Sequence, residues 1–367
     1  MDGVRKSIKI LEVNMVDCGT MTEYVKVIWK DLYKFTIECF TRIGVPAHDA
    51  ELIADHLVLA NLRGVDSHGV IRIPYYIEGV RKGYVKARPE VRIVKEGAAT
   101  ALIDGDDGLG IPIAVRATDI AVDKAKTIGV SAVSVRRLGH VGMLAYYTLR
   151  MSKNNLIGLA TANGPPFVAP WGGSQRIFGT NPISIAFPSI GKPIVIDMAT
   201  SATASFKLRL AALKGEKIPE GIALAKDGRP TTDPKEAYEG ILLPFGGYKG
   251  YAISLAIEVL SALLSGGALS KNIPLHPSTQ GGFFVVAINP ATFREYSEYL
   301  NDVNELIKIV KSCPPAQGFT EVLLPGEPED RNFEIRVRDG IPIDLGTWRL
   351  LIDVARDLGI EPPLTVQ

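Results

Sequence analysis

Apolar residues recur at helical spacing through the first quarter of the chain. The pattern predicts one helix over residues 23–43 and a second that starts at Pro46 and continues to Gly64. Asp49 and Glu51 would lie in the first turn of the second helix, where the helix dipole favours negative charge. These features indicate a helical N-terminal part of the fold.

The stretch DSHGVIRIPYY, residues 66–76, continues the helical pattern. His68 and Arg72 are four residues apart, so on a helix they would lie one above the other. An imidazole and a guanidinium in this arrangement could contact the same small molecule. A solvated helix face near a turn is the alternative that fits the same residues.

Runs of β-branched and apolar residues replace this pattern after residue 90. Gly and Pro turns separate the runs, and helix-like stretches alternate with them. This alternation indicates an α/β protein with a mixed or parallel sheet covered by helices. Further helices are expected over residues 296–313 and 348–358, and the second could pack against the N-terminal helices. The expected strands contain the runs TALIDG, VSAVSVRRL, LIGLATAN, PISIAFP, PIVIDMAT and FFVVAINP.

The longest nearly uncharged run, residues 250–270, has the composition of a membrane span. Glu258 lies near its middle, however, and a carboxylate there costs about 2.5–3.5 kcal/mol on membrane-insertion scales. Gly266 and Gly267 would end the helix after about four turns. We therefore expect a buried helix in the α/β core, and no membrane partner.

The composition fits a folded globular protein. The 367 residues suffice for two domains, and 41 basic against 40 acidic side chains leave no general field that would attract nucleic acid. The cysteines at positions 18, 39 and 313 form no CxxC pair, which argues against a disulfide framework and indicates a cytoplasmic protein. Residues 1–22 lack the apolar core of a signal peptide and are expected to be an extension.

The common nucleotide and metal motifs are absent. LIDGDDGLGIPIA has the wrong spacing for the G-x-G-x-x-G fingerprint and predicts a turn and a helix start, and GGYKGY lacks the spacer of a phosphate-binding loop. None of the five histidines falls in a compact metal-binding spacing, so no metal site is expected. His68 and His140 differ from the others because each stands beside a Gly, where a side chain can approach a ligand.

Four predicted strand ends carry similar turns, rich in small residues, prolines and amides. Such turns let backbone N–H groups approach a ligand at the carboxyl ends of strands. Each one alone is equally typical of a tight turn, and their recurrence favours a binding site. The turns are TANGPPFVAPWGG, IFGTNP, VIDMATSA and LLPFGGYKGY.

Taken together, the motifs resemble the malate/L-lactate dehydrogenase family that does not use a Rossmann fold. That family also contains sulfolactate and ureidoglycolate dehydrogenases and cyclic imino-acid reductases. The resemblance runs from about residue 23 to the end of the sequence, with the motifs in the family's order. They are VDSHGVIRIPYY, GHVGMLAYY, FGTNPISIAFP, DMATS, KGEKIPEG, DGRPTTDP and YKGY.

The resemblance implies a three-layer α/β/α fold with a mixed sheet, and a helical part built from both chain ends. The expected division is a helical substrate and dimerisation part, residues 23–90 and 330–367, and a nucleotide-binding part, residues 91–329. NAD or NADP would bind without a Gly-rich fingerprint, usually in a homodimer.

The resemblance also implies roles for the residues of DSHGVIR. Ser67 and His68 would be the relay and the proton donor, and Arg72 would hold the substrate carboxylate. A 2-oxo acid that becomes a 2-hydroxy acid takes a hydride at carbon and a proton at oxygen, which a histidine titrating near neutral pH can supply. Arg can bind a carboxylate through two contacts. His140 is the proton acceptor in the ureidoglycolate branch, so two histidines compete for one role, and His68 is favoured.

Further site residues follow from the same resemblance. Thr180 would contact the substrate, Lys249 would pair with a cofactor phosphate, and Asp197 at a strand end would accept ribose hydroxyls. The implied cofactor contacts are His140, Val141, Gly142, Met143, Leu144, Asp197, Met198, Ala199, Lys249, Pro325, Gly326 and Glu327.

One segment departs from the family pattern. After DMATSATA the chain has Ser205, Phe206 and Lys207, where hydroxy-acid members read Arg-Gly-Lys and imino-acid reductases end in Asp. Lys207, which we count among the catalytic residues, favours the hydroxy-acid branch. Malate is the first expected substrate, followed by lactate and sulfolactate. The alternatives are an imino-acid reductase or ureidoglycolate dehydrogenase and, outside enzymes, a catalytically silent nucleotide-binding protein.

Overall fold

The computed structural model describes residues 24–203, 207–208, 211–212 and 215–365, so the expected extension over residues 1–22 lies outside them. The chain forms two compact units. Unit 1 combines Met1–Pro74 with Glu329–Gln367, and unit 2 is the intervening Tyr75–Pro328. The sequence-based division lay at residues 90/91 and 329/330, whereas the structure divides at 74/75 and 328/329.

Unit 1 is helical and is closed by a two-stranded antiparallel sheet. Tyr24 pairs with Asp344 and Val27 with Ile341, which joins the two segments of this unit. The helix expected over residues 23–43 is wrong at its start, because Tyr24–Val27 form this strand and the helix begins at Trp29. Its pairing partner lies some 300 positions away, beyond the reach of local periodicity. The elements are β1 (Tyr24–Val27), α1 (Trp29–Arg42), α2 (Ala47–Leu62), β11 (Ile341–Asp344) and α11 (Leu345–Leu358), and the chain passes between the units within α3 (Ile73–Arg81) and α10 (Glu327–Asp339).

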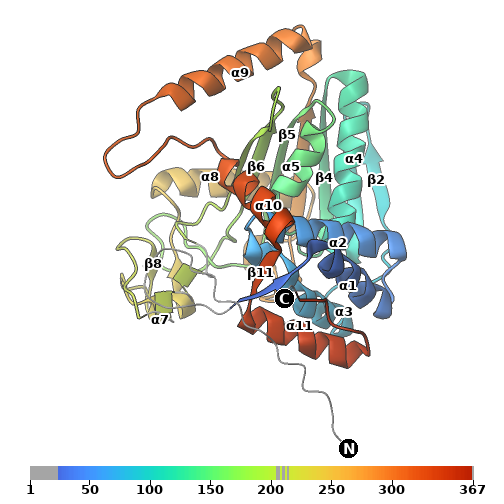
Figure 1. Ribbon diagram of the computed structural model, residues 1–367, viewed down its shortest axis with the longest axis vertical. Coiled ribbons are helices and arrows are strands. Elements are labelled where there is room, and N and C mark those ends of the chain that lie inside the picture. Colours follow the sequence, from blue (N-terminus) through green and yellow to red (C-terminus); the bar gives the residue numbers. More distant parts are fainter. Residues whose placement is uncertain (1–23, 204–206, 209–210, 213–214, 366–367) are drawn as a thin grey trace, which may run out of the picture. The chain divides into compact units, whose positions relative to one another are not determined.

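Unit 2 is built on a seven-stranded sheet with the order β2-β3-β4-β10-β5-β6-β7. Only β3 and β4 run parallel, and every other neighbouring pair is antiparallel, so the sheet is mixed. Figure 1 shows these strands beside α4 and α5. The strands are β2 (Arg92–Glu96), β3 (Thr100–Gly108), β4 (Val130–Leu138), β5 (Ile157–Asn163), β6 (Ile183–Phe187), β7 (Ile194–Met198) and β10 (Gly282–Ile288).

Helices cover both faces of this sheet. On β5, Gly158 faces α5, because an added Cβ would lie 2.7 Å from Met151. Thr161, three residues further along β5, points to the opposite face of the sheet. Its hydroxyl lies 2.9 Å from that of Ser261, in the turn that follows α8. The expected three-layer α/β/α fold with a mixed sheet is thus confirmed. The covering helices are α4 (Gly110–Ile128), α5 (Ala145–Ser152) and α8 (Tyr248–Glu258), the last continued by a π-helical turn, Val259–Leu263.

The buried helix expected over residues 250–270 is only partly right. One side of α8 and the π turn is buried, but Leu255, Val259 and Leu263 are 43%, 45% and 56% exposed. Apolar composition alone could not distinguish a helix buried all round from one with an uncovered apolar side. The described residues of unit 2 also form β8 (Ala223–Leu224), α7 (Pro234–Glu239), β9 (Ile241–Leu242) and α9 (Tyr296–Ser312). None of the helices within the described residues has the length and apolar character needed to cross a membrane.

Candidate active site

One edge of the unit 2 sheet gathers the ends of several strands. Gly282, the first residue of β10, pairs with Arg136 near the end of β4 and with Asn163 at the end of β5. Ile183, the first residue of β6, pairs with Met198 at the end of β7. The predicted turns after β5, before β6 and after β7 therefore lie at one edge of the sheet, together with the segment that follows β4.

The segment His140–Leu144 follows β4 at this edge and is fixed by its backbone. The N–H of Gly139 donates to Gly108 at 2.7 Å, and that of His140 donates to the carbonyl of Ser278 at 2.8 Å. The buried hydroxyl of Tyr147 donates to the carbonyl of Val141 at 2.6 Å. The backbone of this candidate cofactor segment is thus held by hydrogen bonds within the protein.

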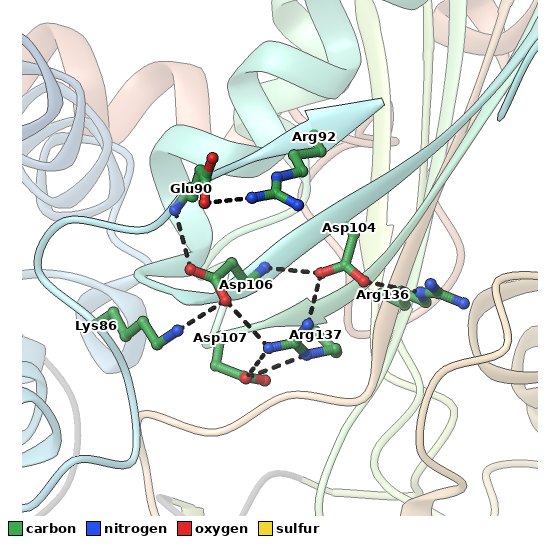
Figure 2. Close-up of polar contacts among 8 residues, drawn as sticks. All are labelled: Lys86, Glu90, Arg92, Asp104, Asp106, Asp107, Arg136 and Arg137. Carbon is green, nitrogen blue, oxygen red and sulfur yellow. Dashed lines mark hydrogen bonds and ion pairs between the residues drawn. The ribbon is translucent and has the colours of Figure 1, made fainter. Parts of the chain in front are cut away.

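A cluster of charged side chains fixes the strand ends that precede this segment (Figure 2). Arg137 donates to Asp107 at 2.6 Å and to Asp104 and Asp106 at 3.1 Å, and these carboxylates follow one another at the end of β3. A backbone N–H from Glu90 and then the Lys86 ammonium lower the pKa of Asp106 to about 2. Three non-glycine residues of this cluster have left-handed backbones, which such a network must hold in place. They are Asp106 (φ 50°), Asp107 (φ 55°) and Arg137 (φ 53°).

Three of the predicted cofactor segments meet in the structure. The carboxylate of Asp197 accepts the backbone N–H of Ala145 at 2.9 Å, which joins the end of β7 to the segment after His140. The N–H of Val195 donates to Pro325 at 3.1 Å, which brings the PGEPEDR segment to the same strand. Gly326 has φ 88° and packs so closely that an added Cβ would lie 2.9 Å from Val195.

Lys249 lies in the first turn of α8, after two glycines with left-handed backbones. The N–H of Phe245 donates to the carbonyl of Thr200 at 3.0 Å, which ties this turn to the end of β7. Lys249 is exposed, as is Asp197. An exposed ammonium at the start of α8 and an exposed carboxylate near the end of β7 fit the phosphates and ribose hydroxyls of a dinucleotide.

Thr180 is linked to this edge by its backbone, because the N–H of Thr200 donates to its carbonyl at 2.8 Å. The next residue, Asn181, is fully buried with φ 33°, and its amide donates to the Glu258 carboxylate at 2.9 Å. Glu258 also accepts the backbone N–H and the hydroxyl of Ser270 at 2.6 and 2.7 Å. The residue that excludes a membrane span is therefore the centre of a buried hydrogen-bond network beside the candidate substrate contact.

Ser67, His68 and Arg72 belong to unit 1, and the single helical face expected for them is wrong. Ser67 and His68 lie in one 3₁₀ turn, Asp66–His68, and Arg72 lies in another, Val70–Arg72. Gly69 between them is extended, with φ −89° and ψ −150°. The side chains are still neighbours: Arg72 Nε donates to the carbonyl of Ser67 at 2.7 Å, and Ser67 Oγ lies 3.0 Å from His68 Nδ1.

Asn61 explains the break at Gly69. Its Oδ1 accepts the backbone N–H of Val70 at 2.8 Å, and its Nδ2 donates to Asp66 at 2.7 Å. A Cβ at Gly69 would lie 2.1 Å from Asn61 Oδ1, so only glycine fits there. Arg336 donates to Asp66 at 2.7 Å and to the carbonyl of Asn61, which anchors the turn from the second segment of unit 1.

The surroundings of His68 keep its imidazole neutral. Burial, followed by the charges of Arg72 and His56, lowers the pKa of His68 to about 3. A histidine with this pKa carries no second proton near neutral pH.

Other sequence predictions have simpler outcomes. Lys207 is exposed, and Ser205 and Phe206 lie outside the described residues. Among the described residues, no group of three or more His, Cys, Asp or Glu side chains could hold a metal ion. Sequence analysis missed the positions of Asn61, Arg336 and Tyr76. The only sequence signal for Asn61 was that a polar residue interrupts an apolar stretch, LVLANL.

The sequence is similar to those of known dehydrogenases. Residues 27–352 match the family model described as malate/L-lactate dehydrogenase. The L-sulfolactate dehydrogenase of Methanocaldococcus jannaschii is 42% identical over 89% of this chain and 96% of its own length, and a malate dehydrogenase of Pyrococcus abyssi is 37% identical over 95% and 99%.

Solved structures give the same result. The M. jannaschii sulfolactate dehydrogenase structure matches with a TM-score of 0.87 and 41% identity over 92% of this chain and 98% of that one. The Pyrococcus horikoshii malate dehydrogenase structure matches with a TM-score of 0.86 and 36% identity over 92% and 97%. This chain therefore belongs to the malate/L-lactate dehydrogenase family, whose members are oxidoreductases.

Proposed function

We propose that this protein is an NAD(P)-dependent dehydrogenase that interconverts a 2-oxo acid and a 2-hydroxy acid, with malate or sulfolactate as the first candidates. The observation that carries the proposal is the meeting of the His140, Asp197 and Pro325 segments at one sheet edge. Relatives named malate and sulfolactate dehydrogenases support the substrate class. Both of these acids carry a second anionic group beside the 2-hydroxy acid.

The roles follow from the groups at each position. Asp197 would accept ribose hydroxyls, Lys249 would neutralise cofactor phosphate, and the segment Val141–Leu144 would contact the same molecule. When bound, the nicotinamide cofactor supplies or accepts the hydride. Arg72, oriented by its hydrogen bond to the carbonyl of Ser67, would hold the substrate carboxylate. A histidine must exchange the proton at the substrate oxygen.

The test is oxidation of NADH and of NADPH, followed by absorbance, with a panel of 2-oxo acids and cyclic imines. We expect turnover with oxaloacetate or sulfopyruvate and little with the imines. Turnover of the imines alone would identify the imino-acid branch. Coenzyme binding without turnover of any panel member would favour the catalytically silent binder.

We also propose that the protein is a homodimer, as the family resemblance implies. No residue of the amphipathic helix α9 is buried, and its Leu306 and Ile309 are 53% and 60% exposed. A helix of 17 residues gains most of its stability from packing an apolar face, which a second copy could cover. Light scattering after gel filtration would give the mass directly, and a monomer at micromolar concentration would contradict the proposal. A cytoplasmic location is proposed from the cysteine usage.

A further inference from the structure

Tyr76 joins α3 to the candidate site within unit 2. It is among the largest fully buried side chains, 2% exposed, and its hydroxyl oxygen lies 2.7 Å from Nδ1 of His140. The two rings are tilted by 52° with centroids 6.0 Å apart, so the contact is made through the hydroxyl and not by stacking. A buried phenol hydroxyl requires a polar partner, and here that partner is the histidine of the GHVG motif.

A second group, the backbone N–H of Gly142, indicates whether the same nitrogen, Nδ1 of His140, carries a proton. The backbone N–H of Gly142 points at His140 Nδ1 from 3.3 Å. Gly142 has φ 71°, a backbone that glycine adopts readily, and this turn directs its N–H back to the ring. Because a backbone N–H can only donate, Nδ1 is an acceptor in the neutral imidazole, whose proton is then on Nε2.

We propose that Tyr76 is a positioning residue for proton transfer: its hydroxyl holds Nδ1 of His140 in both protonation states, so that Nε2 exchanges the proton with the substrate oxygen. The inference rests on the proposed dehydrogenase function. The hydroxyl donates to Nδ1 when the ring is neutral and accepts from Nδ1–H when the ring is an imidazolium, whereas Gly142 can only donate.

The proton balance of reduction follows from this arrangement. As hydride adds to the carbonyl carbon, the C=O π electron pair moves to oxygen, and the Nε2–H bond of the imidazolium breaks as the new O–H bond forms. The neutral ring keeps its remaining proton on Nδ1, donated to Tyr76, until solvent returns a proton to Nε2. In oxidation of the hydroxy acid, Nε2 accepts the hydroxyl proton from the neutral tautomer that carries its proton on Nδ1, donated to Tyr76. The resting ring, with its proton on Nε2, therefore first loses that proton to solvent and gains one on Nδ1.

The contrast with His68 supports assigning this step to His140. Both histidines have a hydroxyl near Nδ1, from Ser67 in one case and from Tyr76 in the other. His68, however, lies among groups that favour its neutral form, with Arg72 foremost among the charges. A neutral His68 beside Arg72 can donate a hydrogen bond to substrate without changing its charge. This assignment reverses the preference for His68 drawn from the sequence.

The test is Tyr76→Phe, which keeps the buried ring and removes only the hydroxyl. We expect kcat for reduction to fall 10- to 100-fold and the affinity for NAD(P)H to stay unchanged. The imidazolium loses its acceptor while the neutral ring keeps the Gly142 N–H, so the pKa of His140 should fall. Reduction, which needs the imidazolium, should therefore decline at a lower pH than in the parent. Tyr75→Phe, the same change at the adjacent position, is the matched control.

A readout independent of turnover separates this inference from the proposed function. Nitrogen-15 NMR of selectively labelled histidine, with the His140 signal assigned from His140→Asn, reports the tautomer and pKa of the ring. We expect Nε2–H in the neutral parent and a lower pKa in Tyr76→Phe. The inference is overturned if the neutral ring carries its proton on Nδ1, or if Tyr76→Phe leaves both the NMR pKa and the pH profile unchanged. A parent that reduces no panel acid refutes the dehydrogenase proposal, and the NMR titration still decides the role of Tyr76.

Discussion

The Glu258 network gives the most quantitative stability prediction. Glu258 is 5% exposed, and its two oxygens accept from the backbone and hydroxyl of Ser270 and from Asn181. In Glu258→Gln one oxygen becomes an NH₂ group. Placed toward Ser270, that NH₂ faces an N–H donor that lies 2.6 Å from the present oxygen. If the NH₂ instead replaces the oxygen that faces Asn181, two NH₂ groups oppose each other. The Asn181 amide also donates to the carbonyl of Ser254, so turning it over would break that bond.

The magnitude follows from this conflict between donors. A hydrogen bond to a charged group contributes about 1.5–3 kcal/mol and a neutral one about 0.5–1.5 kcal/mol, so loss of the charge weakens two bonds by about 1 kcal/mol each. One buried donor left without an acceptor costs roughly a further 1–3 kcal/mol. A total of roughly 3–5 kcal/mol would lower the midpoint of thermal unfolding by roughly 6–20 °C for a unit of this size.

Circular dichroism during heating would measure the effect. Glu239→Gln is the matched control, because Glu239 accepts from Lys226 at 2.7 Å on the surface, with its side chain 64% exposed. We expect the control to melt with the parent. A Glu258→Gln protein that also melts with the parent would show that an amide can replace the buried carboxylate without loss of stability, and the reasoning above would be refuted.

Three further predictions concern the candidate site. Arg72→Lys should lower kcat/KM by roughly 1.5–3 kcal/mol with coenzyme affinity unchanged, because Lys cannot reproduce a two-point contact with a carboxylate; unchanged kinetics would remove Arg72 from the site. Lys249→Ala should raise the KM for coenzyme while the exposed control Lys235→Ala does not, and equal coenzyme affinity by fluorescence titration would make Lys249 an ordinary surface charge. The pKa of His68 is lowered to about 3, so the unfolded state takes up this proton first, near pH 6.5. The free energy of unfolding should therefore fall as pH drops from 6.5 toward 3, and His68→Gln should flatten that slope in urea titrations; an identical slope would contradict the lowered pKa.

Local patterns predicted most elements of unit 2. Each of the six quoted β-branched runs overlaps a strand of the unit 2 sheet, and α9 lies where periodicity placed it; in unit 1, α11 begins three residues before the predicted start at residue 348. β1 was missed because its strand conformation depends on pairing with β11 at the other end of the chain. Periodicity reports which face of a segment is apolar, and cannot report a partner that is distant in sequence.

The candidate site shows the same limit. Motifs identified His140 and Asp197, but not the bond from Asp197 to Ala145 that joins their segments. The break at Gly69 was missed because it is imposed by Asn61, which lies nine positions before Val70, the residue whose N–H it accepts. Tyr76 was inside the quoted motif, yet its partner His140 is 64 positions away. Residue type and spacing can nominate a chemical group, whereas its hydrogen-bond partner depends on the fold.

The construction of unit 1 from two distant segments has a consequence for synthesis on the ribosome. The Ser67–His68 turn emerges early, but β11 and Arg336, which close the unit and anchor that turn, come after about 250 intervening residues. At 5–20 residues per second, the first segment waits roughly 13–50 s for its partners. Throughout that time its apolar helices α1 and α2 lack the α11 packing surface. Unit 2 is complete before unit 1 can close, so a nascent chain stalled near residue 328 would carry the His140 and Asp197 segments while Arg336, which anchors the Ser67–His68 turn, had yet to be made.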